Sequence, residues 1–469
     1  MFLPSLSALG LALASCGSSA SDTRPAPEAA PPPFTVETLA SFEEPWAMDI
    51  DAATNTAIIT EKAGTIRLYL PDGSTGTVSG APEVAYQGQG GLGDVLLAPQ
   101  ADWTPPENGS LDGRRVYLSW AEPGDGDTRG AAVGLGTLAC SAPASCALEG
   151  LEVIWRQTPK VTGAGHYSHR LAFSPDESYL FVSSGERQKG EPAQDTSNTL
   201  GTIVRLLPDG SPAPGNPFAD KGSPSDEIWS YGHRNVLGLA FDANGDLWDL
   251  EHGPAGGDEI NRVEAGLNYG WPLVSDGDHY NGDPIPRHST RPDLAAPAIS
   301  WNPVIAPGDF ILYKGDRYPG FHDKAVIASF SVPGLVLVAL NGTQGVEEAR
   351  YELDHRIREV RETPSGEIWL LEDGPAPDSG HLLKLVPPAK GQSANSIDKA
   401  RAPPYRRAPC PTRPTPQPSF RSTTSTPPSS RTCSTARSNP SDANAPPTRC
   451  AKAWNGSLRS ALRSWTTRT

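Results

Sequence analysis

Short apolar strands separated by tight polar turns dominate the pattern along this chain. A strand, a turn with Asp, Asn or Gly, and a second strand occur as LAFSPDESYLFVSSGE from position 171, LAFDANGDLWDLEHG from 239 and VRETPSGEIWLLEDG from 360. A looser copy, MDIDAATNTAIITEKAGTIRLYLPDG, begins at position 48. Long helical periods are nearly absent, so the pattern predicts an all-β fold built from a repeated hairpin.

A repeated hairpin of this kind is typical of a β-propeller, in which each blade is a small antiparallel sheet. Residues 34–388, at roughly 45 to 60 residues per blade, accommodate six blades more easily than seven. We therefore predict a six-bladed β-propeller domain over residues 34–388. A two-sheet sandwich is the main alternative, but a sandwich does not explain the repeat.

The second strand of each clear copy runs into a stretch that carries polar chemistry, as SSGER, LEHGP and LEDGP. In a propeller, the loops of one face converge on the central channel, and binding sites form there. Residues far apart in the sequence are therefore expected to meet when they occupy equivalent places in the repeat.

Composition agrees with a loop-rich β domain joined to other segments. The chain holds 47 Gly and 49 Pro, and 37% of its residues are hydrophobic. The formal net charge is −15, which argues against nucleic-acid binding because phosphate contacts need a basic face. Residues 391–469 have the opposite sign, with 13 Lys and Arg against 2 Asp and Glu. The acidic excess therefore lies in the preceding part.

Both ends of the chain are predicted to lie outside the folded domain. Residues 1–16 resemble an export signal that ends in a lipobox-like LASC, although no Lys or Arg precedes the apolar run. We expect export to the periplasm, or a bacterial lipoprotein anchored to the membrane through lipid on Cys16. Residues 17–33 are a Pro/Ala-rich linker, and residues 389–469 are a disordered basic tail rich in Pro, Ser, Thr and Arg.

Two cysteines inside the domain, Cys140 and Cys146, lie in LACSAPASCALEG. Export would allow them to close a small disulfide loop. Neither has the CxxC or His spacing of a zinc site, and the sequence holds no CxxCH motif for covalent haem.

The stretch LWDLEHGPAGGDE, residues 247–259, begins as a strand and breaks into a glycine-rich turn. It closes on two carboxylates, Asp258 and Glu259. Backbone carbonyls left free in such a turn, together with carboxylates, are ligands for a hard cation such as calcium. A solvated surface loop is the alternative interpretation of the same residues.

Four further stretches place polar side chains at loop-to-strand junctions: Gln89 in GQGGLGDVLLAP, His166 and His169 in GHYSHRLAF, Arg234 and Asn235 in YGHRNVLGLAF, and Arg356 and Arg358 in DHRIREV. The planar forks of the arginines match carboxylates, so the set indicates a polar site for an anionic ligand. His166 could act as a general base near neutral pH, oriented by Glu186. Taken singly, each could also be a hydrogen-bonding histidine or a solvated strand edge.

Together these stretches resemble the soluble glucose/sorbosone dehydrogenase family, in particular its periplasmic aldose sugar dehydrogenase branch. The resemblance covers most of residues 34–388, and its motifs occur in the family's order. They are GQGGL at 88–92, HYSHR at 166–170, GHRN at 232–235, EHGPAGGDEIN at 251–261, NYGWP at 268–272, WNPVIAPGDF at 301–310 and RIREV at 356–360. The resemblance implies a six-bladed propeller that uses pyrroloquinoline quinone (PQQ), a quinoprotein that oxidises an aldose at C1 to a lactone and passes electrons to an external acceptor.

The resemblance also implies a role for individual residues. His166 would take the proton of the anomeric hydroxyl, and Arg234 would stabilise charge on the quinone oxygen. The carbonyls of Gly253 and Pro254 would hold calcium beside the cofactor. A second, structural calcium would be held by Glu259 and the backbone of Tyr269. The cofactor contacts would be Gln89, Asn235, Tyr280, Arg356 and Arg358.

Two positions depart from the family pattern. Ser331 stands where the family often has a lysine, so one positive contact to the cofactor is missing there, and His169 replaces a small residue next to the sugar site. Two other functions remain open from the sequence: a calcium-dependent lactonase-type hydrolase, and a non-catalytic propeller that serves as a binding module.

Overall fold

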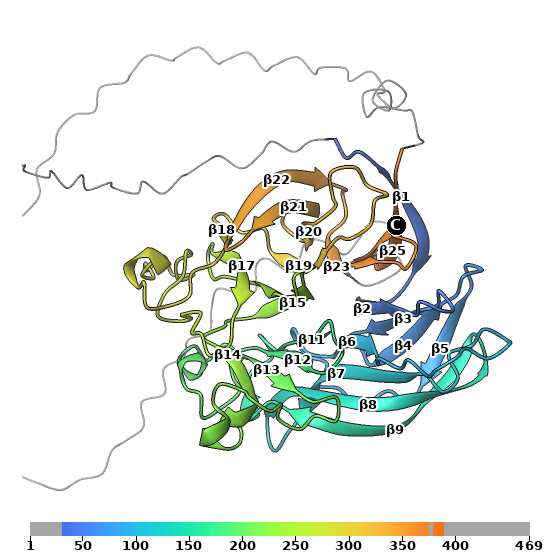
Figure 1. The fold of residues 1–469 in the computed structure, drawn as a ribbon, viewed down its shortest axis with the longest axis horizontal. Coiled ribbons are helices and arrows are strands. Elements are labelled where there is room, and N and C mark those ends of the chain that lie inside the picture. The colour runs from blue at the N-terminus through green and yellow to red at the C-terminus, as the bar shows by residue number, and fades with distance from the viewer. Residues whose placement is uncertain (1–30, 375–378, 389–469) are drawn as a thin grey trace, which may run out of the picture. The chain divides into compact units, whose positions relative to one another are not determined.

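The computed structural model describes residues 31–374 and 379–388. The predicted signal, its Cys16, most of the predicted linker and the basic tail lie outside these residues. The described chain is nearly all-β, as predicted, and Figure 1 shows its strands grouped around a common centre. Its helices are short 3-10 turns, η1 (Glu191–Gln194), η2 (Ala219–Lys221), η3 (Ser225–Glu227) and η4 (His288–Thr290). No described helix is long and apolar enough to cross a membrane.

Three sheets each take four strands that follow one another in sequence and pair in an antiparallel way. The first holds β11 (Ser168–Phe173), β12 (Leu180–Ser184), β13 (Thr202–Leu206) and β14 (Ile228–Tyr231). The second holds β15 (Val236–Phe241), β16 (Leu247–Glu251), β17 (Asp258–Val263) and β18 (Ile299–Trp301). The third holds β19 (Pro307–Leu312), β20 (Lys324–Ser329), β21 (Gly334–Asn341) and β22 (Gln344–Glu352).

A fourth sheet joins the beginning of the described chain to its end. Its order is β1 (Thr35–Ser41), β25 (His381–Val386), β24 (Ile368–Glu372) and β23 (Ile357–Glu362). The first and last described strands therefore pair side by side, and the backbone hydrogen bonds between them close the domain.

The fifth sheet is larger and contains two sequential groups of strands. The first group is β2 (Pro45–Ile50), β3 (Ala57–Glu61), β4 (Thr65–Tyr69) and β5 (Thr75–Ser79). The second is β6 (Leu92–Leu97), β7 (Arg115–Pro123), β8 (Thr128–Ala142) and β9 (Ser145–Arg156), with β10 (Val161–Thr162) paired to β8. The groups meet through parallel pairing of β5 with β9.

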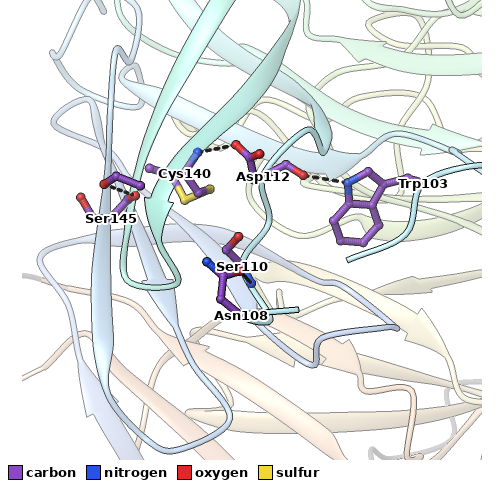
Figure 2. The surroundings of a disulfide bond; sticks show 8 residues. Trp103, Asn108, Ser110, Asp112, Cys140 and Ser145 are labelled. Carbon is purple, nitrogen blue, oxygen red and sulfur yellow. Dashed lines mark hydrogen bonds between the residues drawn. A yellow bond between two sulfur atoms is a disulfide. The ribbon is translucent and has the colours of Figure 1, made fainter. Parts of the chain in front are cut away.

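The predicted disulfide is present at the tip of the β8–β9 hairpin, between Cys140 and Cys146 (Figure 2). Cys146 pairs in register with Val78 of β5, so the crosslink lies where the two groups of the large sheet join. Asp112 connects this hairpin to Trp103. Its Oδ1 accepts a hydrogen bond from the amide of Cys140 at 2.8 Å, and its carbonyl accepts one from Nε1 of Trp103 at 2.9 Å (Figure 2).

The predicted hairpins are confirmed. Those at 171, 239 and 360 are β11–β12, β15–β16 and β23–β24, and the looser copy at 48 forms β2, β3 and β4. Turn chemistry explains them. In the β15–β16 turn, Oδ1 of Asp242 accepts the amides of Asn244 at 2.8 Å and Asp246 at 3.0 Å, while Gly245 takes a φ of 85°.

Six strands form a closed ring: β23, the first strands of the three sequential sheets, and the first strands of the two groups in the large sheet. In order, β2 contacts β6, β6 contacts β11, and the contacts continue through β15, β19 and β23 back to β2. Apolar side chains fill the space between neighbouring sheets; Trp248 and Leu250, for example, share one buried cluster with Phe310 and Ile327.

One buried arginine, Arg170 on β11, reaches every other strand of this ring. Its partners are Oε2 of Glu359 at 2.6 Å, Oδ1 of Asp94 at 3.5 Å, the carbonyls of Leu237 at 2.7 Å and Gly308 at 3.0 Å, and the ring of Trp46 at 4.1 Å. These partners lie on β23, β6, β15, β19 and β2.

A second guanidinium lies among the same buried carboxylates at the centre. Arg361 lies 3.0 Å from Glu359, 3.3 Å from Asp309 and 3.7 Å from Asp94. Burial raises the pKa of Asp94 to about 6 and that of Asp309 to about 7, and Arg170 opposes both shifts. The carboxylates thus depend on the two arginines for their charged state.

Removal of the central guanidinium is expected to destabilise the fold strongly. Arg170→Met leaves Glu359 and Asp94 buried without this partner, and loss of one member of a buried pair costs about 3–5 kcal/mol of unfolding free energy. Arg291→Met is the control, because Arg291 pairs with Asp293 at the surface, where their side chains are 42% and 60% exposed. Such a pair contributes about 0–1 kcal/mol. Urea unfolding measures both variants, and equal losses would contradict the central role of Arg170.

Candidate active site

The loop between β16 and β17 is ordered by a buried carboxylate at its own end. Asp258 accepts the amide of Gly253 at 2.9 Å through Oδ1 and that of Ala306 at 2.6 Å through Oδ2. Burial raises the pKa of Asp258 to about 6, and these amides oppose the shift. Of the two predicted carboxylates, Asp258 therefore orders the loop, and Glu259 is left for other contacts.

Glycines in this loop make room for the protein's own backbone. A Cβ on Gly257 would lie 2.5 Å from the amide nitrogen of Gly277, and one on Gly253 would lie 2.2 Å from the carbonyl oxygen of Gly256. This packing role was not part of the sequence interpretation, which concerned free carbonyls for a cation. The carbonyls of Gly253 and Pro254 accept no hydrogen bond from any described residue, which leaves two oxygens that suit a hard cation.

A cavity of about 440 Å³ brings together part of the predicted cofactor set. Gln89, Asn235 and Arg358 line it. Its remaining polar and aromatic lining includes Glu44, Lys62, Asp373, Trp46, Tyr167, His169, His252 and Phe330. Such a volume suits a small organic ligand, and the flat rings of the lining suit a flat one. The two cations of the lining, Lys62 and Arg358, each lie beside a carboxylate.

The other two predicted cofactor contacts lie outside this lining. Tyr280 is 78% exposed, and its hydroxyl oxygen accepts a hydrogen bond from Arg234 at 3.3 Å. Arg356 lies with its guanidinium 4.8 Å from the ring centre of Phe330, beside Arg358 at 4.5 Å from the same ring. Both therefore border the site without forming the wall of the cavity.

Asp373 holds the two arginines of the RIREV motif. Its Oδ1 accepts Nη2 of Arg358 at 2.6 Å and Nε at 3.0 Å, and its Oδ2 accepts Nη2 of Arg356 at 3.1 Å. Burial would raise the pKa of Asp373, but Arg358 and Arg356 outweigh it and lower that pKa. The carboxylate thus stays charged and fixes the direction of both cations.

His166 is held from two sides. Its Nδ1 lies 2.5 Å from Oε1 of the predicted partner Glu186, and its amide donates to Oε1 of Gln89 at 2.6 Å. The backbone turns sharply here, with φ values of 50° at His166, 58° at Ser168 and 55° at His169. Such strained backbone is typical of functional sites. Because Nδ1–H donates to Glu186, the free lone pair of the neutral imidazole is at Nε2.

The charge state of this pair suits a base. Burial lowers the pKa of His166, Glu186 opposes the shift, and Arg234 adds to it. Burial would raise the pKa of Glu186, but the contact with His166, the amide of Gly190 and the charge of Arg234 together outweigh it and lower that pKa. The pair is therefore a neutral imidazole beside a carboxylate at neutral pH, which is the state that general-base chemistry requires.

Arg234 lies close to His166 and carries an unsatisfied donor. Its Nη1 donates to the carbonyl of His252 at 3.0 Å, and its guanidinium lies 5.1 Å from the ring centre of Trp271. Its Nε is buried and has no hydrogen-bond partner among the described residues. A buried donor left without a partner is costly, so this atom fits a ligand oxygen.

Lys62 is a cation of the cavity that the sequence interpretation missed. Its Nζ lies 3.8 Å from Oε1 of Glu44 and 3.5 Å from the carbonyl of Gly88. Ser331, where a lysine was expected, is not part of the cavity lining and donates to the carbonyl of Val304 at 2.9 Å. The repeat held the signal, because Lys62 follows β3, the second strand of the copy at 48, as Gly185 and Glu186 follow β12.

His169 belongs to the wall of the cavity rather than to free space. Its ring stacks on Trp46 with centroids 5.0 Å apart, and its Nδ1 lies 2.9 Å from Oγ of Ser119. A Cβ on Gly93 would lie 1.9 Å from its Cε1, so the absence of a side chain at Gly93 provides the space. Burial, followed by Arg170, lowers the pKa of His169 to about 3, which keeps the ring neutral.

A second, much smaller cavity of about 10 Å³, roughly the space for one water-sized sphere, is lined by Glu259 and Tyr269. Burial and, to a smaller extent, the negative charge of Glu251 raise the pKa of Glu259 to about 8. The carbonyl of Tyr269 lies 3.3 Å from Nε2 of His288. Burial would lower the pKa of His288, but Asp276 and Glu259 raise it to about 9. An imidazolium therefore already stands beside both predicted ligands of the second calcium.

Comparison with known proteins identifies the family to which this chain is similar. The sequence profile described as Glucose / Sorbosone dehydrogenase matches residues 42–384. The aldose sugar dehydrogenase YliI of Escherichia coli is 35% identical over 368 residues, which cover 76% of this chain and 94% of that protein.

Solved structures agree with the sequence match. The apo-form of the soluble aldose sugar dehydrogenase from Escherichia coli superposes with a TM-score of 0.67 at 33% identity, over 76% of this chain and all of that one. The PQQ-bound aldose sugar dehydrogenase from Streptomyces coelicolor gives 0.59 at 26% identity, over 76% of this chain and 99% of that one.

Proposed function

The chain belongs to the glucose/sorbosone dehydrogenase family, and on that premise we propose that it is a quinoprotein that oxidises aldose sugars. It oxidises the sugar at C1 to the lactone, with PQQ as cofactor and an external acceptor for the electrons. The observation that carries this proposal is the His166–Glu186 pair, a neutral base whose amide bonds to Gln89 in the wall of a cavity lined by paired charges and aromatic rings.

The arrangement of strands supports the six-bladed architecture. Each strand of the closed inner ring begins one group of four, and the large sheet is two such groups joined through β5 and β9. In the fourth sheet β1 comes from the start of the domain and completes the last group. We therefore assign the domain as a six-bladed propeller closed by its first and last strands.

The residues present fit PQQ, a flat tricarboxylic quinone. Arg358 and Lys62 supply positive charge to the cavity, Phe330 and Trp46 supply flat apolar surface, and the unpartnered Nε of Arg234 offers a donor. When bound, PQQ supplies the quinone carbon that takes the hydride from C1, and calcium polarises that quinone. Gln89 and Asn235 orient the ring system from the cavity wall.

The chain's own residues handle the proton. Nε2 of His166 accepts the proton of the anomeric hydroxyl, because Nδ1 is occupied by Glu186. Glu186 holds the ring in that tautomer and stabilises the imidazolium that forms. Arg234 would place a fixed positive charge beside the quinone oxygen, where negative charge develops during the reaction, and its unpartnered Nε is a donor for that oxygen.

Calcium is expected at the carbonyls of Gly253 and Pro254, which fit as free oxygens beside the cofactor residues. A second calcium at Glu259 and the Tyr269 carbonyl requires His288 to move, because its imidazolium already lies beside that carbonyl. We further propose export to the periplasm or anchoring to the membrane through lipid on Cys16; the Cys140–Cys146 disulfide supports an oxidising compartment.

Dye reduction by the purified full chain tests the function. With a panel of aldoses, reduction is expected to need both added calcium and PQQ, and His166→Ala should lower the rate roughly 10²- to 10⁴-fold because the general base is lost. Retained PQQ without sugar-dependent reduction would overturn the dehydrogenase and leave a binding module. Lactone hydrolysis with calcium alone would instead support the hydrolase.

The pH profile tests the pairing of His166 with Glu186. The base works when neutral, so kcat/KM should fall with falling pH below the ordinary histidine pKa of 6.5, because burial lowers the pKa of His166. Glu186 raises that pKa, so Glu186→Gln should move the acid limb to still lower pH and reduce kcat roughly tenfold or more. The exposed Glu191→Gln is the control. An unchanged acid limb in Glu186→Gln would refute the pairing.

Binding of PQQ tests the role of Lys62, a cation that the structure adds to the predicted cofactor contacts. Lys62→Ala should weaken binding roughly tenfold, measured by quenching of tryptophan fluorescence, because a charged partner of a carboxylate is lost. Lys324→Ala is the matched control, since Lys324 of β20 pairs with Glu348 of β22 and is not part of the cavity lining. Equal affinities for Lys62→Ala and the wild type would show that Lys62 does not contact the cofactor.

A further inference from the structure

Two imidazoles and a carboxylate converge at one end of the sheet formed by β1, β25, β24 and β23. His355 lies just before β23, Glu372 ends β24, and His381 begins β25. Nδ1 of His355 is 2.8 Å from Oε1 of Glu372, and Nδ1 of His381 bonds to Oε2 of the same carboxylate. The two rings are 6.1 Å apart between centroids and nearly perpendicular. Three strands thus direct nitrogen and oxygen atoms at one point.

The spacing of these atoms is close to that of ligands around one ion. One ligand atom from each residue lies within 4.8 Å of the others. Zinc–nitrogen and zinc–oxygen bonds are about 2.0–2.2 Å, so ligands of one tetrahedral ion stand roughly 3–4 Å apart. The side chains of His355 and His381 are 30% and 23% exposed, so the ion can enter from solvent and the rings can adjust.

We propose that His355, Glu372 and His381 bind a divalent transition-metal ion of the zinc class, with water at the fourth position. Two imidazoles and one carboxylate are the ligand set that such ions prefer, whereas calcium selects oxygen ligands. The site is independent of the proposed sugar oxidation and of the calcium at Gly253 and Pro254.

The position of the site indicates a structural role. His381 pairs with Ser41 of β1, where the first and last described strands of the domain meet. Glu372 precedes Asp373, the carboxylate that holds Arg356 and Arg358 at the cofactor cavity. A bound ion would therefore tie the ends of β23, β24 and β25 together at the closure of the ring.

A second cluster of the same residue types is a poorer candidate. His233, Asp249 and Glu251 also converge, but all three are fully buried. Glu251 accepts the amides of Arg234 and Asn235, and His233 stacks on Tyr269 with centroids 4.7 Å apart. These groups already serve the wall of the candidate active site.

Calorimetric titration of the full chain with zinc chloride tests the proposal. The protein is first stripped with EDTA, kept free of calcium and PQQ, and treated with iodoacetamide, because Cys16, Cys410, Cys433 and Cys450 would otherwise compete for zinc. One saturable site per chain is expected. His355→Ala and His381→Gln should each weaken it at least tenfold, and zinc should raise the Tm of the wild type but not of these variants.

His322→Ala is the matched control, because His322 is an exposed histidine between two carboxylates, 3.3 Å from Asp316 and 3.5 Å from Asp323. It should bind zinc as the wild type does. Cobalt in place of zinc should give visible absorption bands that His355→Ala abolishes. Absence of saturable binding, or equal affinity in His355→Ala and the wild type, would show that the three side chains only hydrogen-bond to one another. The Tm of each metal-free variant reports whether it is folded.

Discussion

A guanidinium buried at the centre of the domain sets the constraint on which the rest of the structure depends. Arg170 reaches all five other strands of the inner ring through ionic contacts, carbonyl hydrogen bonds and the face of Trp46. A charge in that position is tolerated only when carboxylates from other strands surround it. The charge of Arg170 is therefore compensated by carboxylates only when the ring of strands is closed. The same segment that carries Arg170 also carries the candidate base His166, so the centre of the fold positions the chemistry.

Residues of the motif HYSHR contribute both to the fold and to the candidate active site. Arg170 joins the inner strands, His169 stacks on Trp46 in the space left by Gly93, and His166 turns toward Glu186 through backbone of positive φ. The cations near this motif differ in their hydrogen-bond and ionic partners. Arg358 and Lys62 each face a carboxylate, which fixes or balances them, while Arg234 keeps one buried donor without a partner. The site therefore combines rigid positive charge with an open position for a ligand oxygen.

Much of the fold and part of the site could be predicted from the sequence. Alternation and turn residues located the hairpins, and the ends of their second strands supplied Glu186 and the loop at Gly253. Lys62 was missed although the repeat places it at the end of β3, because the family pattern directed attention to Ser331. Two other features could not be predicted. His288 lies beside Tyr269 although no motif includes it. The cluster of His355, Glu372 and His381 forms only when β23, β24 and β25 lie side by side.

The sequence by itself determined the all-β class, the repeat and the residue types that the chemistry needs, because strand alternation and turn preferences are local properties. It also indicated the family, because the motifs and their order can be recognised without knowing which residues lie close together in space. Tertiary structure alone decided which charges meet. Whether Asp258 orders a loop, Glu259 faces a cavity or Arg358 bonds to Asp373 depends on strands that are neighbours in space and distant in sequence. Burial then sets the pKa of each group, because desolvation exists only once the ring has closed.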